Sequence, residues 1–415
     1  MPKQKHIALV AYYWPPTGGS GVQRWLFFAK AWARAGVRVS VFVPKTPRRA
    51  EHDDSLVLDA HKNLRVISVS GWEPMRQNKS AIAENVGNKK GLFHRFTRWI
   101  RANFFIPDAR VYWAKAAAKA VMKSYKTAPF DILITTGPPH SLHLIGLIVT
   151  KSLSIKWVAD FRDPWAGFFQ NASLPMGRRA KAQHQKLEQK VVETADQVVV
   201  TAPSLAAQFK PYNSKVALFT NGYEKMLKKS ATQSLELVYT GSLKAQQNPH
   251  ALWAAIAELT QENNTFAKNF TLELYGSVAT SVLEDIKGFG IDNYVHVHGY
   301  RNKDEIDAIL PQARALLLVG VDMPNTGNII HGKLFEYMAA ARPVLGIGPI
   351  PSDMQNLFDT HHLGIYAGFD EKKRIKETLL TWFTKEKINF AGTGIDVYER
   401  SHIAAHYLRL IKQLI

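Results

Sequence analysis

Short apolar runs alternate with longer amphipathic stretches through the first half of the chain. The runs lack the strict apolar–polar alternation of a half-exposed strand, which is typical of parallel strands covered on both faces. Residues 25–35 repeat apolar positions at helical spacing and precede Gly36, which predicts a helix ending there. The predicted strands of this half are residues 7–12, 37–43, 64–69, 132–135, 157–160, 197–201 and 216–219.

The second half of the chain repeats this pattern after a polar stretch, residues 225–234, that predicts a linker. Alternation of strand and helix predicts a doubly wound sheet on each side of the linker. We therefore expect an α/β fold of two Rossmann-like domains, residues 1–224 and 235–390, that face an interdomain cleft. The predicted strands here are residues 235–239, 271–275, 294–297, 315–319 and 343–346, and a last helical run covers residues 397–415.

Composition narrows the class of protein. The chain of 415 residues has no cysteine, which excludes disulfides, a thiol nucleophile and thiolate metal sites. No apolar run reaches the roughly 18 residues of a membrane-spanning helix. The N-terminus resembles a secretory signal briefly, but Pro15, Pro16 and a glycine-rich loop replace the cleavage site. We expect a cytoplasmic protein, peripheral on the inner face of the cell membrane.

Positive charge is confined to the first half. The formal net charge is +19, and residues 1–210 carry 32 basic and 13 acidic side chains, so the remainder is neutral. An uneven distribution of charge along the chain bears on which partners the protein binds rather than on its fold. The partner of the first half is therefore expected to be anionic: a membrane surface, a phosphorylated substrate or nucleic acid.

One basic stretch has the pattern of a helix that lies in a lipid headgroup layer. At about 100° per residue, one face carries the apolar residues Leu92, Phe96, Trp99 and Ile100. The opposite face carries Arg95, Arg98 and Arg101. This separation indicates an interfacial helix. The alternative is an amphipathic helix packed on the core, and the charge imbalance favours the membrane surface.

A glycine-rich loop follows the first predicted strand. Glycine lets the backbone approach a ligand closely, and the start of the next helix favours an anion. Gly19, Ser20 and Gly21 are candidates for ligand contacts, and Arg24 for a phosphate. The loop is no dinucleotide fingerprint, because Arg24 stands at the third glycine position, and no P-loop. The alternative is a turn that only reverses the chain.

Residues 325–344 form the most informative stretch, a polar loop followed by a helix that stops before Pro343. Unpaired amides at the start of a helix can hold a phosphate. Lys333 and Glu336 are three residues apart and share a helix face. The carboxylate can accept hydrogen bonds from two sugar hydroxyls. The alternative is an exposed lysine–glutamate pair.

This stretch resembles the donor-binding motif of the retaining family-4 glycosyltransferases, which have the GT-B fold and build bacterial polysaccharides. The resemblance covers nearly the whole chain and rests on the order and spacing of short motifs. It implies a nucleotide-diphosphate sugar donor, retained anomeric configuration, and a terminal helix within residues 391–415 that crosses back to the first domain. The matching segments are residues 13–21, 158–165, 220–223, 239–243, 298–300 and 333–337.

The resemblance assigns residues to the donor. Glu336 matches the carboxylate that usually holds the nucleotide ribose. Asn328 stands where the family often has a second glutamate, eight positions earlier, and its amide can still bond a sugar hydroxyl. The implied donor contacts are Gly19, Ser20, Gly21, Ser242, Lys244, Tyr300, Gly327, Asn328, Ile329, Ile330, Lys333 and Glu336.

The family's pair of diphosphate-binding cations is absent. The position of its arginine is Ser242 and that of its lysine is Gln247. The leaving-group charge must then be neutralised by other cations, and the candidates are Lys244, Lys333 and Arg24. No Asp-x-Asp triplet or metal-ligand spacing occurs, so we expect no metal, and no cofactor because the nucleotide sugar is a substrate.

Candidate catalytic residues follow two strands of the first half. His140 lies in a turn and matches a family position that faces the reacting sugar; the alternative is a turn histidine without a role. Asp160, Arg162 and Asp163 end the next strand, where a carboxylate can bind or deprotonate an acceptor hydroxyl. The alternative is a structural ion pair. Arg110 is a candidate contact for an acceptor phosphate.

Three functions compete. The leading one is a glycosyltransferase that uses a nucleotide-diphosphate sugar and a lipid-linked or other anionic glycan acceptor at the cytoplasmic membrane face. The second is a non-catalytic scaffold or nucleotide-sugar-binding protein, which the absent cation pair favours. The third is nucleic-acid binding, argued from charge alone; we do not expect it, because no aromatic and basic platform on a recognisable module is present.

Overall fold

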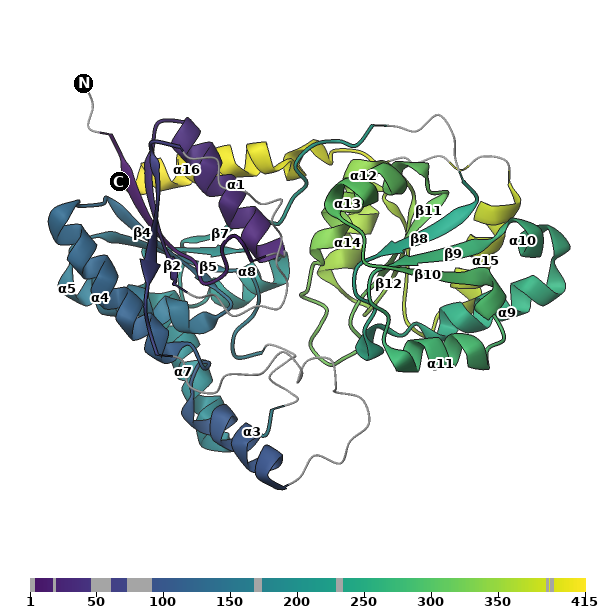
Figure 1. Cartoon of the computed structure of the whole chain (residues 1–415), viewed down its shortest axis with the longest axis horizontal. Coiled ribbons are helices and arrows are strands. Elements are labelled where there is room, and N and C mark those ends of the chain that lie inside the picture. The colour runs from purple at the N-terminus through teal and green to yellow at the C-terminus, as the bar shows by residue number, and fades with distance from the viewer. Residues whose placement is uncertain are drawn as a thin grey trace. The chain divides into compact units, whose positions relative to one another are not determined.

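The computed structural model describes residues 4–17, 20–45, 61–72, 92–167, 174–228, 234–385, 388 and 392–415. The chain divides into two compact units (Figure 1). Unit 1 comprises Met1–Asn221 and Arg400–Ile415, and unit 2 comprises Gly222–Glu399. Among the described residues, no helix has both the length and the apolar character needed to cross a bilayer.

Unit 1 is built on a parallel sheet of seven strands. They are β1 (His6–Val10), β2 (Arg38–Pro44), β3 (Leu64–Val69), β4 (Ile132–Gly137), β5 (Lys156–Phe161), β6 (Gln197–Val200) and β7 (Val216–Leu218). The order in the sheet is β3-β2-β1-β4-β5-β6-β7, a doubly wound arrangement whose order reverses between β1 and β4. Every residue of β1 and β4 is buried, which explains why neither strand alternates regularly between apolar and polar residues.

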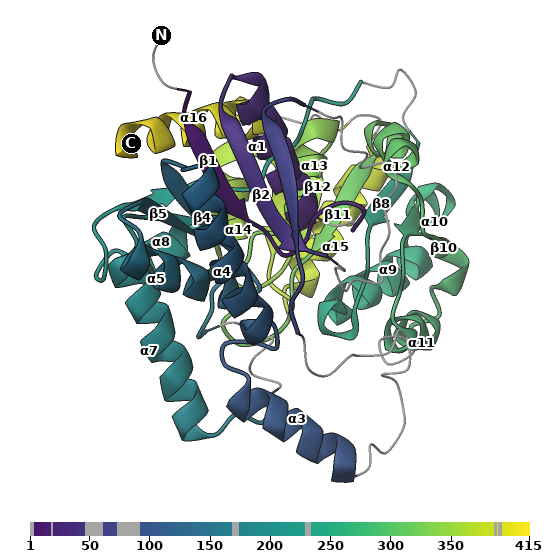
Figure 2. The same cartoon turned by 60° about the vertical axis from the view of Figure 1, so that its left-hand side comes forward.

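The described part of unit 1 has seven helices. They are α1 (Ser20–Arg34), α3 (Leu92–Phe104), α4 (Val111–Thr127), α5 (His143–Ser152), α7 (Arg178–Thr194), α8 (Pro203–Phe209) and α16 (Arg400–Leu414), with a 3-10 turn, η1 (His140–Leu142). Figure 2 shows α7 running away from the sheet, with α3 beside its far end. The Asn103 side chain links these two helices, because it donates to the Pro175 carbonyl and accepts from the Gly177 amide.

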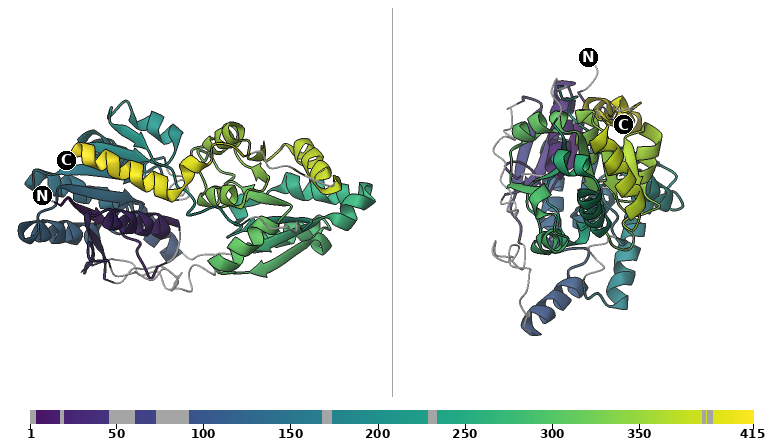
Figure 3. Two further views of the ribbon diagram at one scale, coloured as in Figure 1. Left: turned by 90° about the horizontal axis from the view of Figure 1, so that it is seen from above. Right: turned by 90° about the vertical axis from the view of Figure 1, so that its right-hand side faces the viewer.

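Helix α16 packs on α1 although the two are far apart in sequence (Figure 3, left). The Tyr407 ring lies 5.5–6.1 Å from the rings of Trp25, Phe28 and Trp32. The helix begins at Arg400, later than the start at residue 397 that the apolar spacing predicts. A short 3-10 turn, η5 (Asp396–Tyr398), precedes it.

Unit 2 repeats this topology with six parallel strands. They are β8 (Glu236–Thr240), β9 (Thr271–Tyr275), β10 (Val295–Gly299), β11 (Ala315–Val319), β12 (Val344–Ile347) and β13 (Gly364–Ala367). Their order is β10-β9-β8-β11-β12-β13, which reverses between β8 and β11. Two Rossmann-like sheets, the expected fold class, are therefore present. All twelve predicted strands are found within two residues of their predicted bounds, and β13, a four-residue edge strand, was not predicted.

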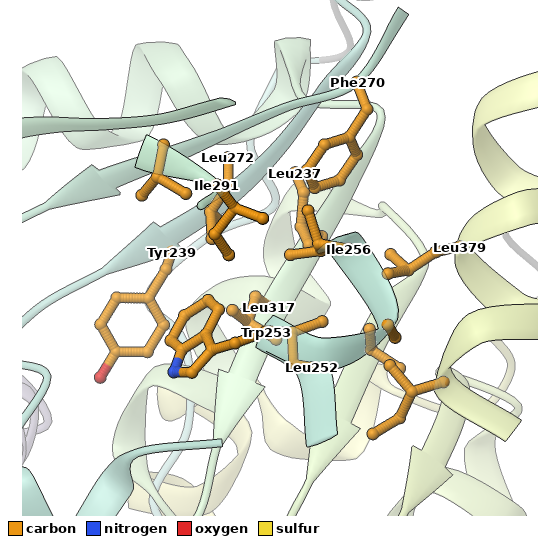
Figure 4. Close-up of a cluster of buried hydrophobic side chains, with 14 of the residues drawn as sticks. Leu237, Tyr239, Leu252, Trp253, Ile256, Phe270, Leu272, Ile291, Leu317 and Leu379 are labelled. Atoms are coloured by element: carbon orange, nitrogen blue, oxygen red, sulfur yellow. The ribbon is translucent and has the colours of Figure 1, made fainter. Parts of the chain in front are cut away.

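The helices of unit 2 enclose a separate core (Figure 4). Trp253, Ile256 and Leu379 pack there against Tyr239 and Leu272 of the sheet. The helices are α9 (His250–Glu262), α10 (Asn264–Asn269), α11 (Thr280–Gly288), α12 (Lys303–Ile309), α13 (Gly332–Ala340), α14 (Asp353–His361) and α15 (Lys372–Thr384); the 3-10 turns are η2 (Ala245–Gln247), η3 (Asp292–Tyr294) and η4 (Leu310–Gln312).

Candidate functional site

The loops that the sequence singled out follow the strands at which each sheet reverses its order. In an open parallel sheet, ligands bind beyond the carboxyl ends of the strands at this point. In unit 1 these are the loop after β1 and the turn after β4, which carries His140. In unit 2 they are residues 241–244 after β8 and residues 320–331 after β11. Each unit thus has a candidate site at the edge where ligands gather.

The turn after β8 is shaped by glycine. Gly241 has φ +97° and Gly276 has φ +130°, conformations that other residues rarely adopt. A Cβ atom on Gly276 would overlap the Gly241 carbonyl, so the turns after β8 and β9 lie directly against each other. Ser242, at the family's arginine position, is exposed and its hydroxyl accepts from Ser277 at 2.9 Å. Lys244 is also exposed.

Lys333, in the first turn of α13, lies beside this glycine turn. Its Nζ donates to the Tyr239 hydroxyl at 2.8 Å and lies 4.0 Å from the centre of the Tyr239 ring. A Cβ atom on Gly241 would lie 3.1 Å from the same Nζ. Burial lowers the pKa of Lys333 to about 7. An anion bound beside this amine would favour its protonated, charged form.

Gln247, at the family's lysine position, faces the interior. Its side-chain amide donates to the Val319 carbonyl at 2.9 Å, and the residue is buried. It therefore ties η2 to the end of β11. The two candidate cations of unit 2 are thus both near the glycine turn: Lys244 follows it in sequence, and Lys333 reaches it from α13.

The loop before α13 presents unpaired polar atoms. The Oδ1 of Asn328 and the Nε2 of His331 are buried and have no hydrogen-bond partner among the described residues. Burial lowers the pKa of His331 to about 4, so its ring is neutral near pH 7. Gly327 has a packing role, since a Cβ would lie 2.8 Å from the Pro351 carbonyl. Ile329 and Ile330 are half-buried in the same loop.

Two further donor candidates of unit 2 are partly or fully accessible. The Glu336 carboxylate is one turn along α13 from Lys333 and lies 4.0 Å from the ammonium of Lys303. Tyr300 follows β10 and is 79% exposed. Glu336 thus lies on the same helix as the cation at the glycine turn.

In unit 1, His140 lies on an aromatic platform. Its ring stacks on Trp165 with a centroid distance of 5.4 Å and an interplanar angle of 8°. Trp165 is held in place by α7, because its indole donates to His184 and its backbone amide to Glu188. Neither ring nitrogen of His140 has a hydrogen-bond partner in the described part of the chain. Burial lowers the pKa of His140 to about 3, so the ring is a neutral donor and acceptor.

Arg162 bridges the turn after β4 and the start of α1. Its guanidinium donates to the Pro138 carbonyl at 2.5 Å and lies against Gly21, where a Cβ atom would overlap it. Burial raises the pKa of the adjacent Asp163 carboxyl, and the Arg162 charge opposes that shift. His140, Arg162, Asp163 and Gly21 therefore lie close together at one edge of the sheet.

Arg24 and Asp160 are buried and paired, which is the arrangement of the structural alternative. The Arg24 guanidinium donates to the carbonyls of Phe219 and Thr220 and lies 3.6 Å from the Asp160 carboxylate. Asp160 also accepts from Thr136. Burial raises its pKa. The catalytic role of Asp160 and the phosphate role of Arg24 stay predictions. Their contacts connect α1 and β5 to the residues that follow β7.

The remaining predicted residues of unit 1 are Arg110, Ser20 and Gly19. Arg110 stacks over the Tyr12 ring at 5.4 Å. Ser20 is the first residue of α1. Gly19 lies outside the described residues, so its predicted donor contact is not placed.

The predicted interfacial helix is α3, and its aromatic side chains are exposed to solvent. Phe96 is 57% exposed, Trp99 44% and Phe104 68%. The Phe96 and Trp99 rings stack at 6.3 Å. Three arginines accompany them: Arg95 is exposed, whereas Arg98 and Arg101 are half-buried. We call Phe96, Trp99, Phe104 and these arginines the α3 surface.

Sequence reasoning missed the residues that hold the site side chains in place. Tyr239 was part of a matching segment and Trp165 of another, but neither was assigned a role. His331 and His184 were not singled out. Hydrogen bonds across each unit identify Tyr239, Trp165 and His184. His331 is identified by its buried Nε2, which has no partner among the described residues. Among the described residues, no group of three or more His, Asp or Glu side chains has the arrangement of a metal site.

Known families match both units. A family described as "Glycosyl transferase 4-like domain" matches residues 19–222, and one described as "Glycosyl transferases group 1" matches residues 234–361. Together these matches cover four fifths of the chain. A search of curated protein sequences found no match.

Solved structures with similar folds span the whole chain. Sucrose-phosphate synthase from Thermosynechococcus elongatus is 14% identical with a TM-score of 0.67, and 99% of each chain is covered. WaaG, a glycosyltransferase involved in lipopolysaccharide biosynthesis, is 14% identical with a TM-score of 0.55, covering 97% of this chain and 95% of that one. A trehalose-6-phosphate protein from E. coli, bound with UDP-2-fluoro glucose, is 10% identical with a TM-score of 0.63, covering 99% and 100%.

Proposed function

We propose that this chain, which belongs to the family-4-type glycosyltransferases of the GT-B fold, moves a sugar from a nucleotide-diphosphate donor to a lipid-linked or other anionic glycan acceptor. The observation that carries the proposal is the arrangement on α13. Lys333 lies at the glycine turn after β8, and Glu336 is on the same helix one turn later. A cation suits a diphosphate, and a carboxylate suits the paired hydroxyls of a ribose. The WaaG likeness supports a role in cell-surface polysaccharide biosynthesis.

The proposed reaction retains the anomeric configuration and uses no metal. The bond from the anomeric carbon to the diphosphate breaks, and the acceptor oxygen bonds to the same face of the sugar. The acceptor proton passes to an oxygen of the departing phosphate. Lys333, Lys244 and the amides at the start of α13 stabilise the charge that develops on the leaving group. His140, Arg162 and Asp163 are proposed to bind the reacting sugar or the acceptor hydroxyl.

A mutant of Glu336 tests the donor site. Nucleotide sugars with UDP, GDP, ADP and dTDP are first screened for an increase in melting temperature, since a ligand that binds the folded state stabilises it. We expect Glu336→Ala to lower transfer from the best donor about 100-fold, or roughly 2.7 kcal/mol, without changing the fold. The matched control is Glu377→Ala on the exposed side of α15, which should keep full activity.

The outcomes separate the competing functions. Wild-type turnover in Glu336→Ala would contradict the proposed site. Binding of nucleotide sugars without transfer to any acceptor would instead identify a nucleotide-sugar-binding scaffold, which the absent arginine–lysine pair favours. Activity that survives EDTA, and NMR of the product, test metal independence and retention.

We further propose that the α3 surface holds the protein on an anionic bilayer. Its exposed aromatic side chains suit the acyl boundary of a headgroup layer, and its arginines suit the lipid phosphates. The basic excess of residues 1–210 adds a long-range attraction of the same sign. A membrane location would bring the enzyme to a lipid-linked acceptor.

Vesicle binding tests this surface. We expect the double variant Phe96→Ser, Trp99→Ser to lose most of its binding to phosphatidylglycerol vesicles in a flotation assay, because the apolar anchors are gone. Tyr212→Ser removes an equally exposed aromatic residue elsewhere in unit 1 and should bind as wild type does. Equal flotation of the double variant and wild type would argue against the α3 surface.

A further inference from the structure

A single side chain supports the Lys333 ammonium. The Tyr239 ring lies beneath it, and the Tyr239 hydroxyl accepts its one hydrogen bond. An ammonium has three N–H donors. No carboxylate of the described residues forms an ion pair with Lys333; the carboxylate of Glu336 lies 4.0 Å from Lys303 instead. Two donors of Lys333 are therefore left for a ligand.

The Tyr239 hydroxyl is also bonded to the glycine turn. It donates to the Ser242 carbonyl at 2.9 Å while it accepts from Lys333 at 2.8 Å. One hydroxyl thus fixes the distance between the cation and the turn after β8. The ring itself is fully buried beside Trp253 (Figure 4), with its hydroxyl at the edge of the core. A phenylalanine would keep this packing and lose only the two hydrogen bonds.

The charged groups around Lys333 leave its protonation finely balanced. Burial lowers its pKa to about 7, Glu336 raises it and Lys244 lowers it. His331, at the start of α13, has a pKa of about 4 because of burial, so it is neutral at pH 7. Burial raises the pKa of Tyr239, so the phenol keeps its proton. Lys333 is then the group of this set that titrates near neutrality.

We propose that Tyr239 positions Lys333 for the diphosphate of the donor, and that donor binding draws a proton onto the Lys333 amine. The inference rests on the proposed function and concerns how the same site replaces the family's missing cation pair. A diphosphate that accepts the two free N–H groups favours the charged form of the amine. Binding of the donor would therefore increase the fraction of molecules in which Lys333 is protonated.

The sign of the pH dependence follows. Near pH 7 a fraction of the unliganded sites carries a neutral amine, and the bound sites are charged, so binding takes up a fraction of a proton. Below pH 6 the amine is already charged and affinity is constant. Above pH 7 the affinity falls, approaching tenfold per pH unit, because each binding event must first protonate the amine.

Calorimetry with intact nucleotide sugars measures this uptake. Their phosphates do not titrate near pH 7, whereas the terminal phosphate of a free nucleotide does, with a pKa of about 6. The probes are UDP-glucose, UDP-N-acetylglucosamine and GDP-mannose, used with the full chain at pH 7 in two buffers of different ionisation enthalpy. The difference in observed enthalpy gives the protons taken up, and titrations from pH 6 to 9 give the affinity profile.

Four variants test whether Lys333 is the group that takes up the proton. Lys333→Met should bind more weakly, with no uptake and a flat profile. Tyr239→Phe should bind at least fivefold more weakly at pH 7, and its affinity should begin to fall at a lower pH, because the ammonium has lost its acceptor. Lys244→Met should weaken binding and move the fall in affinity to a higher pH, because the charge of Lys244 lowers the pKa of Lys333. Tyr337→Phe, which loses a buried hydroxyl bonded to Thr240, should keep both the affinity and the uptake.

The failures are distinguishable. Wild type that binds a nucleotide sugar without proton uptake, or Tyr239→Phe with wild-type affinity and profile, overturns this inference and leaves the proposed function standing. A pH profile that persists in Lys333→Met overturns it as well. Wild type that binds none of the probes contradicts the proposed function and, with it, this inference.

Discussion

The Arg162 guanidinium occupies the space that a side chain at position 21 would need. Glycine is required there for close approach, because the first turn of α1 and the turn after β4 share this guanidinium. The contact keeps Arg162 beside His140 and Asp163. A glycine in the first turn of α1 therefore shapes the candidate catalytic cluster.

Gly21→Ala should consequently disturb catalysis more than donor binding. The added methyl group must displace Arg162 and its bond to Pro138, and overpacking of this kind costs about 1–3 kcal/mol. We expect transfer to fall at least tenfold while calorimetric affinity for the donor falls less. Gly167→Ala is the control, because no atom of the described part of the chain lies within 4 Å of its Cβ position. Wild-type transfer in Gly21→Ala would show that Arg162 has no part in the reaction.

Helix α16 completes the core of unit 1 from the far end of the chain. Its residues Ile403, Tyr407 and Ile411 are buried against α1. The Tyr407 ring also stacks on Phe219 at 4.7 Å, and its hydroxyl donates to Asp160 at 3.4 Å. The element thus supports the buried Arg24–Asp160 pair as well as the apolar core.

Tyr407→Ala should destabilise unit 1 severely. Removing a large buried aromatic ring costs about 3–5 kcal/mol, because it loses both the transfer free energy and the packing around the cavity. His406→Ala, on the exposed side of the same helix, should change stability by less than about 0.5 kcal/mol. Urea unfolding followed by tryptophan fluorescence measures both, and a loss below about 1 kcal/mol in Tyr407→Ala would mean that α16 is dispensable for the core.

The two units differ in charge, and this predicts different ligands for them. The basic excess lies in residues 1–210, which belong to unit 1, whereas the donor candidates on α13 and after β8 belong to the neutral half. A surface field of one sign attracts an extended anionic partner, while a local site with a few oriented groups binds a small one.

Hydrogen exchange should separate these two roles. A nucleotide sugar should protect residues 241–244 and 325–333 of unit 2 and leave the α3 surface unchanged. Vesicles with phosphatidylglycerol should protect residues 95–104 of unit 1, and neutral phosphatidylcholine vesicles should protect them less. Donor protection confined to unit 1 would contradict the assignment of the donor to unit 2.

Local patterns were enough to predict most of the fold. Strands such as β9 and β11 have the bounds that their apolar runs predicted, because buried parallel strands need no other signal. The helix that carries Lys333 and Glu336 was also expected from its spacing and from Pro343. The edge strand β13 was missed, since four residues beside an exposed edge carry no periodicity.

The partners of the candidate site residues depended on tertiary structure. Tyr239 and Lys333 are 94 residues apart and meet because the sheet places β8 next to β11, whose following loop leads into α13. Arg24 and Thr220 are 196 residues apart. Periodicity, capping and turn chemistry act within a few residues, so the amino-acid order determined the elements and the family likeness. Which side chain holds which depends on strand order and burial, and these exist only once the chain has folded.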